Sequence, residues 1–158
     1  MNVKIEWKKL IVSLAAPLAA GFLSALITKD NMVMFELVKK PPLAPPGWLF
    51  PVAWTVLYIL MGLASYWLWI SGAQPRVKKA GAVYYALSLV FNFAWPIIFF
   101  NLDKFLAAFV WLCLLWVFIL LAAVQFLKAD RRAGLAMLPY LLWVAFAGYL
   151  NLGIYLLN

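Results

Sequence analysis

Five long stretches without a charged side chain constrain this chain more than any other feature of its sequence. They cover residues 10–27, 49–70, 80–100, 105–127 and 135–157. As a helix that rises about 1.5 Å per residue, even the shortest, with 18 residues, extends about 27 Å. That length approaches the ~30 Å hydrocarbon core of a bilayer, where only helices and closed barrels satisfy every backbone hydrogen bond. The pattern predicts an all-α membrane protein, a bundle of five transmembrane helices forming a single domain over residues 1–158.

The composition supports a membrane protein rather than a soluble domain. Hydrophobic residues make up 68% of the chain and charged residues only 11%, whereas a soluble domain is about half apolar and about a quarter charged. The basic start, Met1–Lys9, followed by an apolar run also fits a signal peptide. The run over residues 10–27 is long for that purpose and has no clear cleavage site, so we expect a retained helix.

Lysine and arginine are distributed unevenly over the two sides of the predicted bundle. The chain has 13 such residues against five Asp and Glu residues. In a membrane protein this excess indicates topology and contact with anionic lipid, not nucleic-acid binding. The N-terminus and the turns at 71–79 and 128–134 share one side with nine of them, whereas the loops at 28–47 and 101–104 hold four. The positive-inside rule therefore predicts a cytoplasmic N-terminus.

A proline-rich loop joins the first and second predicted spans. Its last part reads KKPPLAPPGWLFPVAW over residues 39–54, with four prolines in six positions. Proline fixes φ, lacks an N–H and pushes the preceding residue toward extended geometry, so those positions cannot be helix interior. We expect a stiff loop that enters a helix near Trp48, with Pro51 in the first turn and a short helix over residues 32–38. A rigid loop with tryptophans at the mouth of an apolar helix predicts the wall or lid of a pocket.

The predicted spans contain no histidine and no charged side chain, the residues that usually carry acid–base chemistry. The chain has no histidine, its only cysteine is Cys113, and no span contains Asp, Glu, Lys or Arg. These absences argue against an ion-coupled transporter, a metal site and a conventional nucleophile–base pair. We expect no cofactor and no metal, and a tetrapyrrole would be held by its ring faces rather than by an axial ligand.

The spans do contain aromatic and amide side chains at helical spacing. They lie on the second span (Trp54 and Tyr58), the third (Asn92, Trp95 and Phe99) and the fifth (Trp143, Ala147, Leu150 and Asn151). One interpretation is packing, with tryptophans in interfacial belts and asparagines that hold helices together. The other is the wall of a ligand pocket. The spacing alone leaves both interpretations open.

Three motifs in this order resemble the TspO/MBR family, the bacterial relatives of the mitochondrial translocator protein. They are KPPLAPPGWLFPVAW at residues 40–54, NFAWPIIFF at 92–100 and PYLLWVAFAGYLN at 139–151. The resemblance covers nearly the whole chain. It implies a five-helix bundle, a homodimer in a bacterial cell membrane, and a pocket roofed by the first loop.

The resemblance also implies a ligand class and the residues that meet it. Members of the family bind porphyrins such as protoporphyrin IX, sterols and synthetic benzodiazepine-site ligands, and some bacterial members degrade protoporphyrin IX in light and oxygen. Trp54 and Trp143 match the two tryptophans associated with that photochemistry and are the candidate catalytic residues. The candidate ligand-binding residues are Trp54, Tyr58, Asn92, Trp95, Phe99, Trp143, Phe146, Ala147 and Leu150.

This sequence departs from the family pattern in the proline-rich loop. Many bacterial members carry a Trp-Tyr pair where this chain has Met34 and Phe35, and a tryptophan where it has Leu43. We therefore expect a less aromatic pocket roof. At the mouth of the pocket, Lys39 and Lys40 are placed where they could reach the propionates of a porphyrin.

Two functions of different classes follow from the resemblance. The first is a membrane receptor or sensor for porphyrins and other lipophilic ligands, with light-dependent porphyrin degradation in the same pocket. The second is a transporter or carrier that moves tetrapyrroles or sterol-like lipids across the membrane. The lack of charge within the spans favours the first. For the homodimer, the small residues Gly81, Ala82 and Ala86 make the third span the candidate interface.

Overall fold

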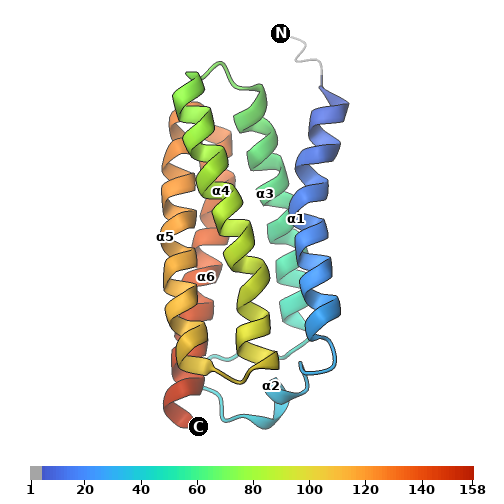
Figure 1. Ribbon diagram of the computed structural model, residues 1–158, viewed down its shortest axis with the longest axis vertical. Coiled ribbons are helices and arrows are strands. Elements are labelled where there is room, and N and C mark those ends of the chain that lie inside the picture. Colours follow the sequence, from blue (N-terminus) through green and yellow to red (C-terminus); the bar gives the residue numbers. More distant parts are fainter. Residues whose placement is uncertain (1–4) are drawn as a thin grey trace.

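The computed structural model describes residues 5–158 as long helices that lie side by side (Figure 1). The elements in order are α1 (Trp7–Thr28), α2 (Met34–Leu37), α3 (Leu49–Ile70), α4 (Pro75–Pro96), the π-helix η1 (Ile97–Asn101), α5 (Phe105–Ala129) and α6 (Arg131–Leu157). Within residues 5–158, with α4 and η1 taken together, five helices are long and apolar enough to cross a membrane. The predicted five-helix membrane bundle is confirmed, and the chain is an integral multi-pass membrane protein. Lys4, part of the basic start, lies outside the described residues.

The connections between the helices alternate between the two ends of the bundle. Figure 1 shows the start of α1 and the α3–α4 connection at the top, and the loop with α2 together with the C-terminus at the bottom. α3 packs against α1 and α6, and α5 packs against α4 and α6. Because α4 also contacts α1, the five long helices close into a ring.

Two predicted turns are shorter than expected because their basic residues belong to helices. α4 begins at Pro75 rather than at residue 80, with proline at the first helical position, where its missing N–H costs little. α6 begins at Arg131 rather than at residue 135, and Asp130 alone separates it from α5. The Asp130 side chain caps α6 by accepting from the Arg132 backbone N–H at 2.8 Å. Long cationic side chains at helix ends reach the bilayer surface, so the helices can continue through them.

The three small residues considered for a dimer interface do not share one face of α4. Gly81 is buried, and a methyl group added there would lie 3.2 Å from Leu68 and 3.3 Å from Phe126. Ala82 and Ala86 are exposed. The expectation for Gly81 is therefore wrong, because its small size serves packing inside the bundle.

The helix type changes at Pro96. This proline has no N–H to donate to the preceding turn, and the chain continues as η1. In the turn before the proline, the Phe93 carbonyl oxygen accepts from the Ser24 hydroxyl of α1, with 3.0 Å between the two oxygens. Beyond the change, Phe99 points into the interior and is only 2% exposed.

The loop between α1 and α3 matches the prediction in most respects. The short helix is present as α2, although it is shorter than residues 32–38. α3 begins at Leu49, and Pro51 lies in its first turn as predicted. The loop covers one end of the bundle (Figure 1).

Several contacts fasten this proline-rich loop to α6, among them a hydrogen bond of 2.7 Å that the Tyr149 hydroxyl donates to the Pro42 carbonyl oxygen. The Asn158 side chain accepts from the Lys39 backbone N–H at 3.0 Å and donates to the Lys39 carbonyl oxygen at 2.9 Å. Gly153 lies so close to Pro41 that an added methyl group would be 2.5 Å from the proline Cγ. The loop is therefore anchored at its proline-rich half, which explains how a segment with little regular structure keeps a fixed position.

Candidate functional site

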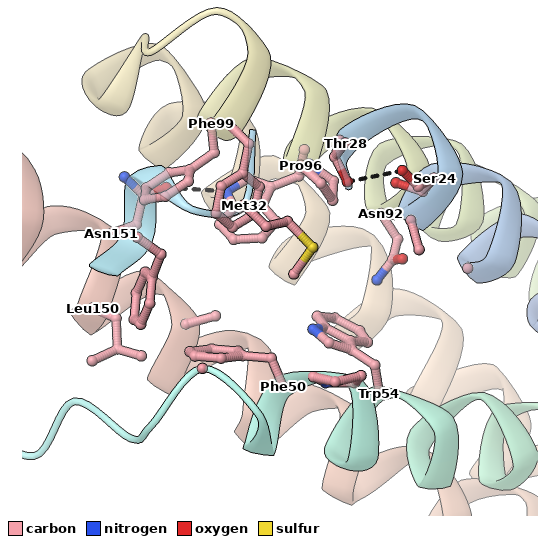
Figure 2. A pocket seen from close by; sticks show the side chains of 18 of the residues that line it. Ser24, Thr28, Met32, Phe50, Trp54, Asn92, Pro96, Phe99, Leu150 and Asn151 are labelled. Atoms are coloured by element: carbon pink, nitrogen blue, oxygen red, sulfur yellow. Dashed lines mark hydrogen bonds between the residues drawn. The ribbon is translucent and has the colours of Figure 1, made fainter. Parts of the chain in front are cut away.

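A cavity of about 480 Å³ lies inside the bundle at the end that the proline-rich loop covers. Small-molecule sites typically measure about 300–1,000 Å³. The walls come from α1, α3, α4 with η1, and α6, and the loop with α2 adds a further side (Figure 2). The lining residues are Gly21, Ser24, Ala25, Thr28, Met32, Val33, Phe35, Glu36, Gly47, Trp48, Phe50, Pro51, Trp54, Tyr58, Asn92, Trp95, Pro96, Phe99, Phe100, Ala147, Leu150, Asn151 and Ile154.

Two stacked aromatic pairs stand on different walls of the cavity. On α3, Trp54 stacks on Tyr58 with ring centres 5.5 Å apart. On α4 and η1, Trp95 stacks on Phe99 with ring centres 5.2 Å apart. Figure 2 shows Trp54 on one side and Phe99 on the other, with the Met32 sulfur pointing into the space between them. Such walls favour a flat, apolar ligand.

Two asparagine side chains line the cavity and also join helices. Asn92 accepts from the Tyr58 hydroxyl at 2.8 Å, and its amide nitrogen donates to the Tyr140 hydroxyl at 3.3 Å. Asn151 accepts from the Trp95 indole N–H at 3.0 Å and donates to the backbone carbonyl of residue 105 at 2.7 Å. The two interpretations left open by the sequence, packing and pocket wall, therefore apply to the same residues. Each amide nitrogen carries a second hydrogen, which can serve a ligand.

Seven of the nine candidate ligand-binding residues line this cavity. They are Trp54, Tyr58, Asn92, Trp95, Phe99, Ala147 and Leu150. Trp143 and Phe146 are not lining residues of this cavity, and both border a separate groove between α3 and α6.

Helical geometry explains why these two residues leave the cavity wall. Phe146 is one residue from Ala147, which turns it about 100° away from the wall that Ala147 lines. Trp143 lies one turn farther along α6, and it contacts the cavity residue Trp54 edge-on with ring centres 6.5 Å apart. The prediction that Trp143 and Phe146 line the cavity is therefore wrong. Trp143 contacts the cavity residue Trp54 from outside the cavity, so it stands behind Trp54.

α1 contributes a wall whose residues were not among the predicted site residues. Gly21, Ser24 and Thr28 line the cavity at intervals of three and four residues, on one face of the helix. The Thr28 hydroxyl donates to the Ser24 carbonyl oxygen at 3.0 Å, so its polarity is satisfied within α1. A methyl group added at Gly21 would overlap the Tyr58 ring. Small side chains at this spacing were the available signal for a recess beside α3. Met32 and Glu36 of the loop region had no such signal.

The loop region meets the cavity through Phe35 rather than through Met34 or Leu43. Phe35 is buried and packs edge-on against Phe50, with ring centres 5.1 Å apart. Met34 is not a lining residue. Leu43 is 83% exposed and has φ 68°, in the left-handed region. The expectation that Leu43 forms part of the roof is wrong, because the turn that follows Pro42 directs its side chain to the outside.

The chemistry available to this cavity is that of rings, amides and indoles. Among residues 5–158, no three His, Cys, Asp or Glu side chains are grouped so that they could hold a metal ion. The lining residues can bury a flat ligand, offer it amide hydrogen bonds, and supply electron-rich indoles at Trp54 and Trp95. No lining residue is a cysteine or a histidine.

Comparison with known proteins finds relatives that match along nearly their whole length. The TspO/MBR family matches residues 13–157. The tryptophan-rich protein TspO of Chlorobaculum tepidum is 38% identical over 159 residues, which cover 100% of this chain and 99% of that protein. The tryptophan-rich sensory protein of Cereibacter sphaeroides is 32% identical, over 94% of this chain and 90% of that protein. The translocator protein of Bos taurus is 34% identical, over 85% of this chain and 81% of that protein.

Proposed function

The chain belongs to the TspO/MBR family, and from this premise we propose that it is a membrane receptor or sensor for porphyrins such as protoporphyrin IX and for other flat lipophilic ligands. The supporting observation is the pair of aromatic stacks in the cavity, Trp54 with Tyr58 and Trp95 with Phe99. A macrocycle between them gains about 0.5–1.5 kcal/mol per ring pair beyond the burial of its surface. The name of the relative from Cereibacter sphaeroides, a sensory protein, supports the receptor role.

The proposal includes light- and oxygen-dependent degradation of a bound porphyrin. An excited porphyrin takes an electron from the Trp54 indole and passes it to oxygen, and the superoxide that forms attacks the macrocycle. The porphyrin–oxygen adduct that forms carries one extra electron and returns it to the oxidised Trp54, so that the net reaction is porphyrin plus oxygen. Trp143, edge-on to Trp54 with ring centres 6.5 Å apart, shares the electron deficiency until that return. This chemistry needs light, oxygen and the porphyrin itself, and no further cofactor.

A homodimer is part of the same proposal. The exposed Ala82 and Ala86 of α4 allow the close approach of a second helix, as small residues do in membranes. Chemical crosslinking in liposomes, with a large residue at Ala86 as the disrupting variant, tests this interface.

The test of the proposed function is a titration of protoporphyrin IX into the purified protein. Tryptophan fluorescence is followed in the dark, and the Soret band is then followed under illumination, with protein-free micelles as the control. Quenching at micromolar ligand with protein-dependent bleaching supports the receptor and the degradation together. Quenching without bleaching leaves a receptor or a carrier that does not alter the ligand. Absence of quenching rejects porphyrins as the ligand class.

A further inference from the structure

One lining residue sets the charge that a ligand meets at the cavity. Among the 23 lining residues, all within the described part of the chain, Glu36 of α2 is the only one with a formal charge at neutral pH. Its side chain is 62% exposed. Trp48 and Met32, also lining residues, are exposed beside it in the same loop region. These exposed lining residues form the mouth of the cavity, so Glu36 is a residue of the mouth.

Contacts on both sides fix the position of the Glu36 carboxylate. A methyl group added at Gly47 would lie 2.7 Å from Glu36 Oε1, so the carboxylate rests against the chain where it enters α3. The other oxygen, Oε2, lies 3.5 Å from Lys40 Nζ. The carboxylate thus reaches from α2 to the start of α3, along the edge of the mouth.

The neighbouring lysine does not replace Glu36 as the charge nearest to the ligand. Lys40 Nζ lies 4.9 Å from the centre of the Phe35 ring, where a cation is attracted to the ring face. Lys40 is not a lining residue, whereas Glu36 is. Of this ion pair, only Glu36 contributes to the lining of the cavity, and the Lys40 ammonium group is held outside the lining by Glu36 and the Phe35 ring.

The interior of the cavity has no place for an ionised group. Its polar side chains are hydroxyls, amides and indole N–H groups, and none of them carries a positive charge that could pair with a carboxylate. An ionised carboxylate moved from water into such a site without a cationic partner is strongly destabilised. The ionised substituents of a ligand must consequently stay at the mouth, near Glu36.

We propose that Glu36 gives the cavity a preference for neutral or cationic flat lipophiles over those that carry carboxylates. The proposal rests on the proposed function and refines it, because it names the charge class of the ligand. It also changes the role expected for Lys39 and Lys40, because the charged side chain that lines the cavity, Glu36, repels a propionate.

The experiment compares two ligands that differ only in charge, protoporphyrin IX and its dimethyl ester, in neutral detergent in the dark. Tryptophan quenching gives both affinities for the wild type, for Glu36→Gln and for Glu6→Gln. The Glu6 variant is the matched control, because it neutralises a carboxylate that is also paired with a lysine, Lys9. Glu6 directly precedes α1, which begins at the end of the bundle opposite to the proline-rich loop (Figure 1). The measured quantity is the ratio of diacid to diester affinity in each variant relative to the same ratio in the wild type, since this comparison cancels the different partitioning of the two ligands into micelles.

Glu36→Gln should raise the affinity for the diacid by about tenfold, the scale of one nearby charge at the protein surface. It should leave the affinity for the diester within twofold, and Glu6→Gln should leave the ratio unchanged. In the wild type, added NaCl should narrow the gap between the two ligands through screening, a readout that needs no folded variant. The inference is overturned if the ratio of diacid to diester affinity is unchanged in Glu36→Gln, or if the difference between the two affinities in the wild type does not depend on salt. In either case, binding of the diester still supports the proposed function. Failure of both ligands to bind the wild type overturns the proposed function and this inference with it.

Discussion

Tyr58 of α3 and Asn92 of α4 are joined by a hydrogen bond of 2.8 Å between the tyrosine hydroxyl and the amide oxygen. Both residues line the cavity, and the Asn92 amide nitrogen continues to the Tyr140 hydroxyl of α6. Three helices are thereby linked at one wall of the cavity. The surface offered to a ligand is also part of the polar core that holds the bundle together, so a change here affects both stability and binding.

Replacing Tyr58 with phenylalanine should weaken the bundle by removing the donor to Asn92. The expected loss in the free energy of unfolding is about 1 kcal/mol, the usual scale for such bonds in water and in membranes. Thermal unfolding in detergent measures it. Tyr155→Phe is the control, because its side chain is exposed. An equal loss in both variants would contradict the role assigned to this hydrogen bond.

Substitutions of Trp54 and of Trp143 should have different effects on ligand binding and on photochemistry. Trp54 lines the cavity, so Trp54→Ala should lower porphyrin affinity by about tenfold or more, as loss of a buried aromatic contact does. Trp143 stands behind it, so Trp143→Phe should keep the dark affinity within twofold and slow the bleaching of the Soret band. Dark titration and illuminated absorbance give the two values. A large loss of dark affinity in Trp143→Phe would show that the second tryptophan contacts the ligand.

Gly153→Ala should loosen the proline-rich loop, although alanine has a higher helix propensity than glycine and so stabilises α6, in which residue 153 lies. The added methyl group would lie 2.5 Å from Cγ of Pro41, and a proline ring cannot move aside without its backbone. Alanine gains about 1 kcal/mol of helix propensity over glycine, so the thermal midpoint alone does not isolate the effect. Hydrogen exchange at the backbone amides of the non-proline residues of 39–49 isolates the effect on the loop, and this exchange should become faster.

Gly72→Ala is the matched control for this change. A methyl group at Gly72 would meet no atom within 4 Å. In the Gly72→Ala variant, the exchange rates of residues 39–49 in the proline-rich loop should equal those of the wild type. Unaltered loop exchange in Gly153→Ala would mean that the contact with Pro41 does not hold the loop.

The fold was predictable because lipid leaves few alternatives for a chain of this kind. Uncharged runs of membrane-spanning length have to become helices. Among these long helices, the starts of α4 and α6 were misjudged because their first turns, from Pro75 and from Arg131, contain lysine or arginine. A rule that ends a span at its first charge ignores the reach of long cationic side chains to the bilayer surface. Asp130, a capping residue with a positional preference, marked the true start of α6.

The candidate site was predictable only along single helices. Spacing correctly grouped Asn92, Trp95 and Phe99, since one face of one helix decides that set. It could not show how deep along α6 the cavity extends, and so Trp143 was assigned to the wall. Glu36 was missed for a different reason. Its place at the mouth depends on how the loop folds back against the start of α3, and no local pattern in the loop encodes that contact.

Stability in acid should depend on Asp130, the residue between α5 and α6. Its carboxylate accepts from the Arg132 guanidinium at 2.8 Å and from the Arg132 backbone N–H, and these bonds lower the pKa of Asp130 from its ordinary value of 3.8. A carboxyl with a lowered pKa stabilises the folded state fully above the ordinary value, and that contribution disappears as the pH falls through the lowered one. We expect the thermal midpoint of the wild type in detergent to decrease as the pH is taken below 3.8.

Asp130→Asn keeps a capping side chain that does not titrate, so the thermal midpoint of this variant should change less over the same pH range. The loss in the wild type should be modest, about 1 kcal/mol, because Arg132 is largely exposed. Parallel acid curves for the two proteins would show that other groups govern this range.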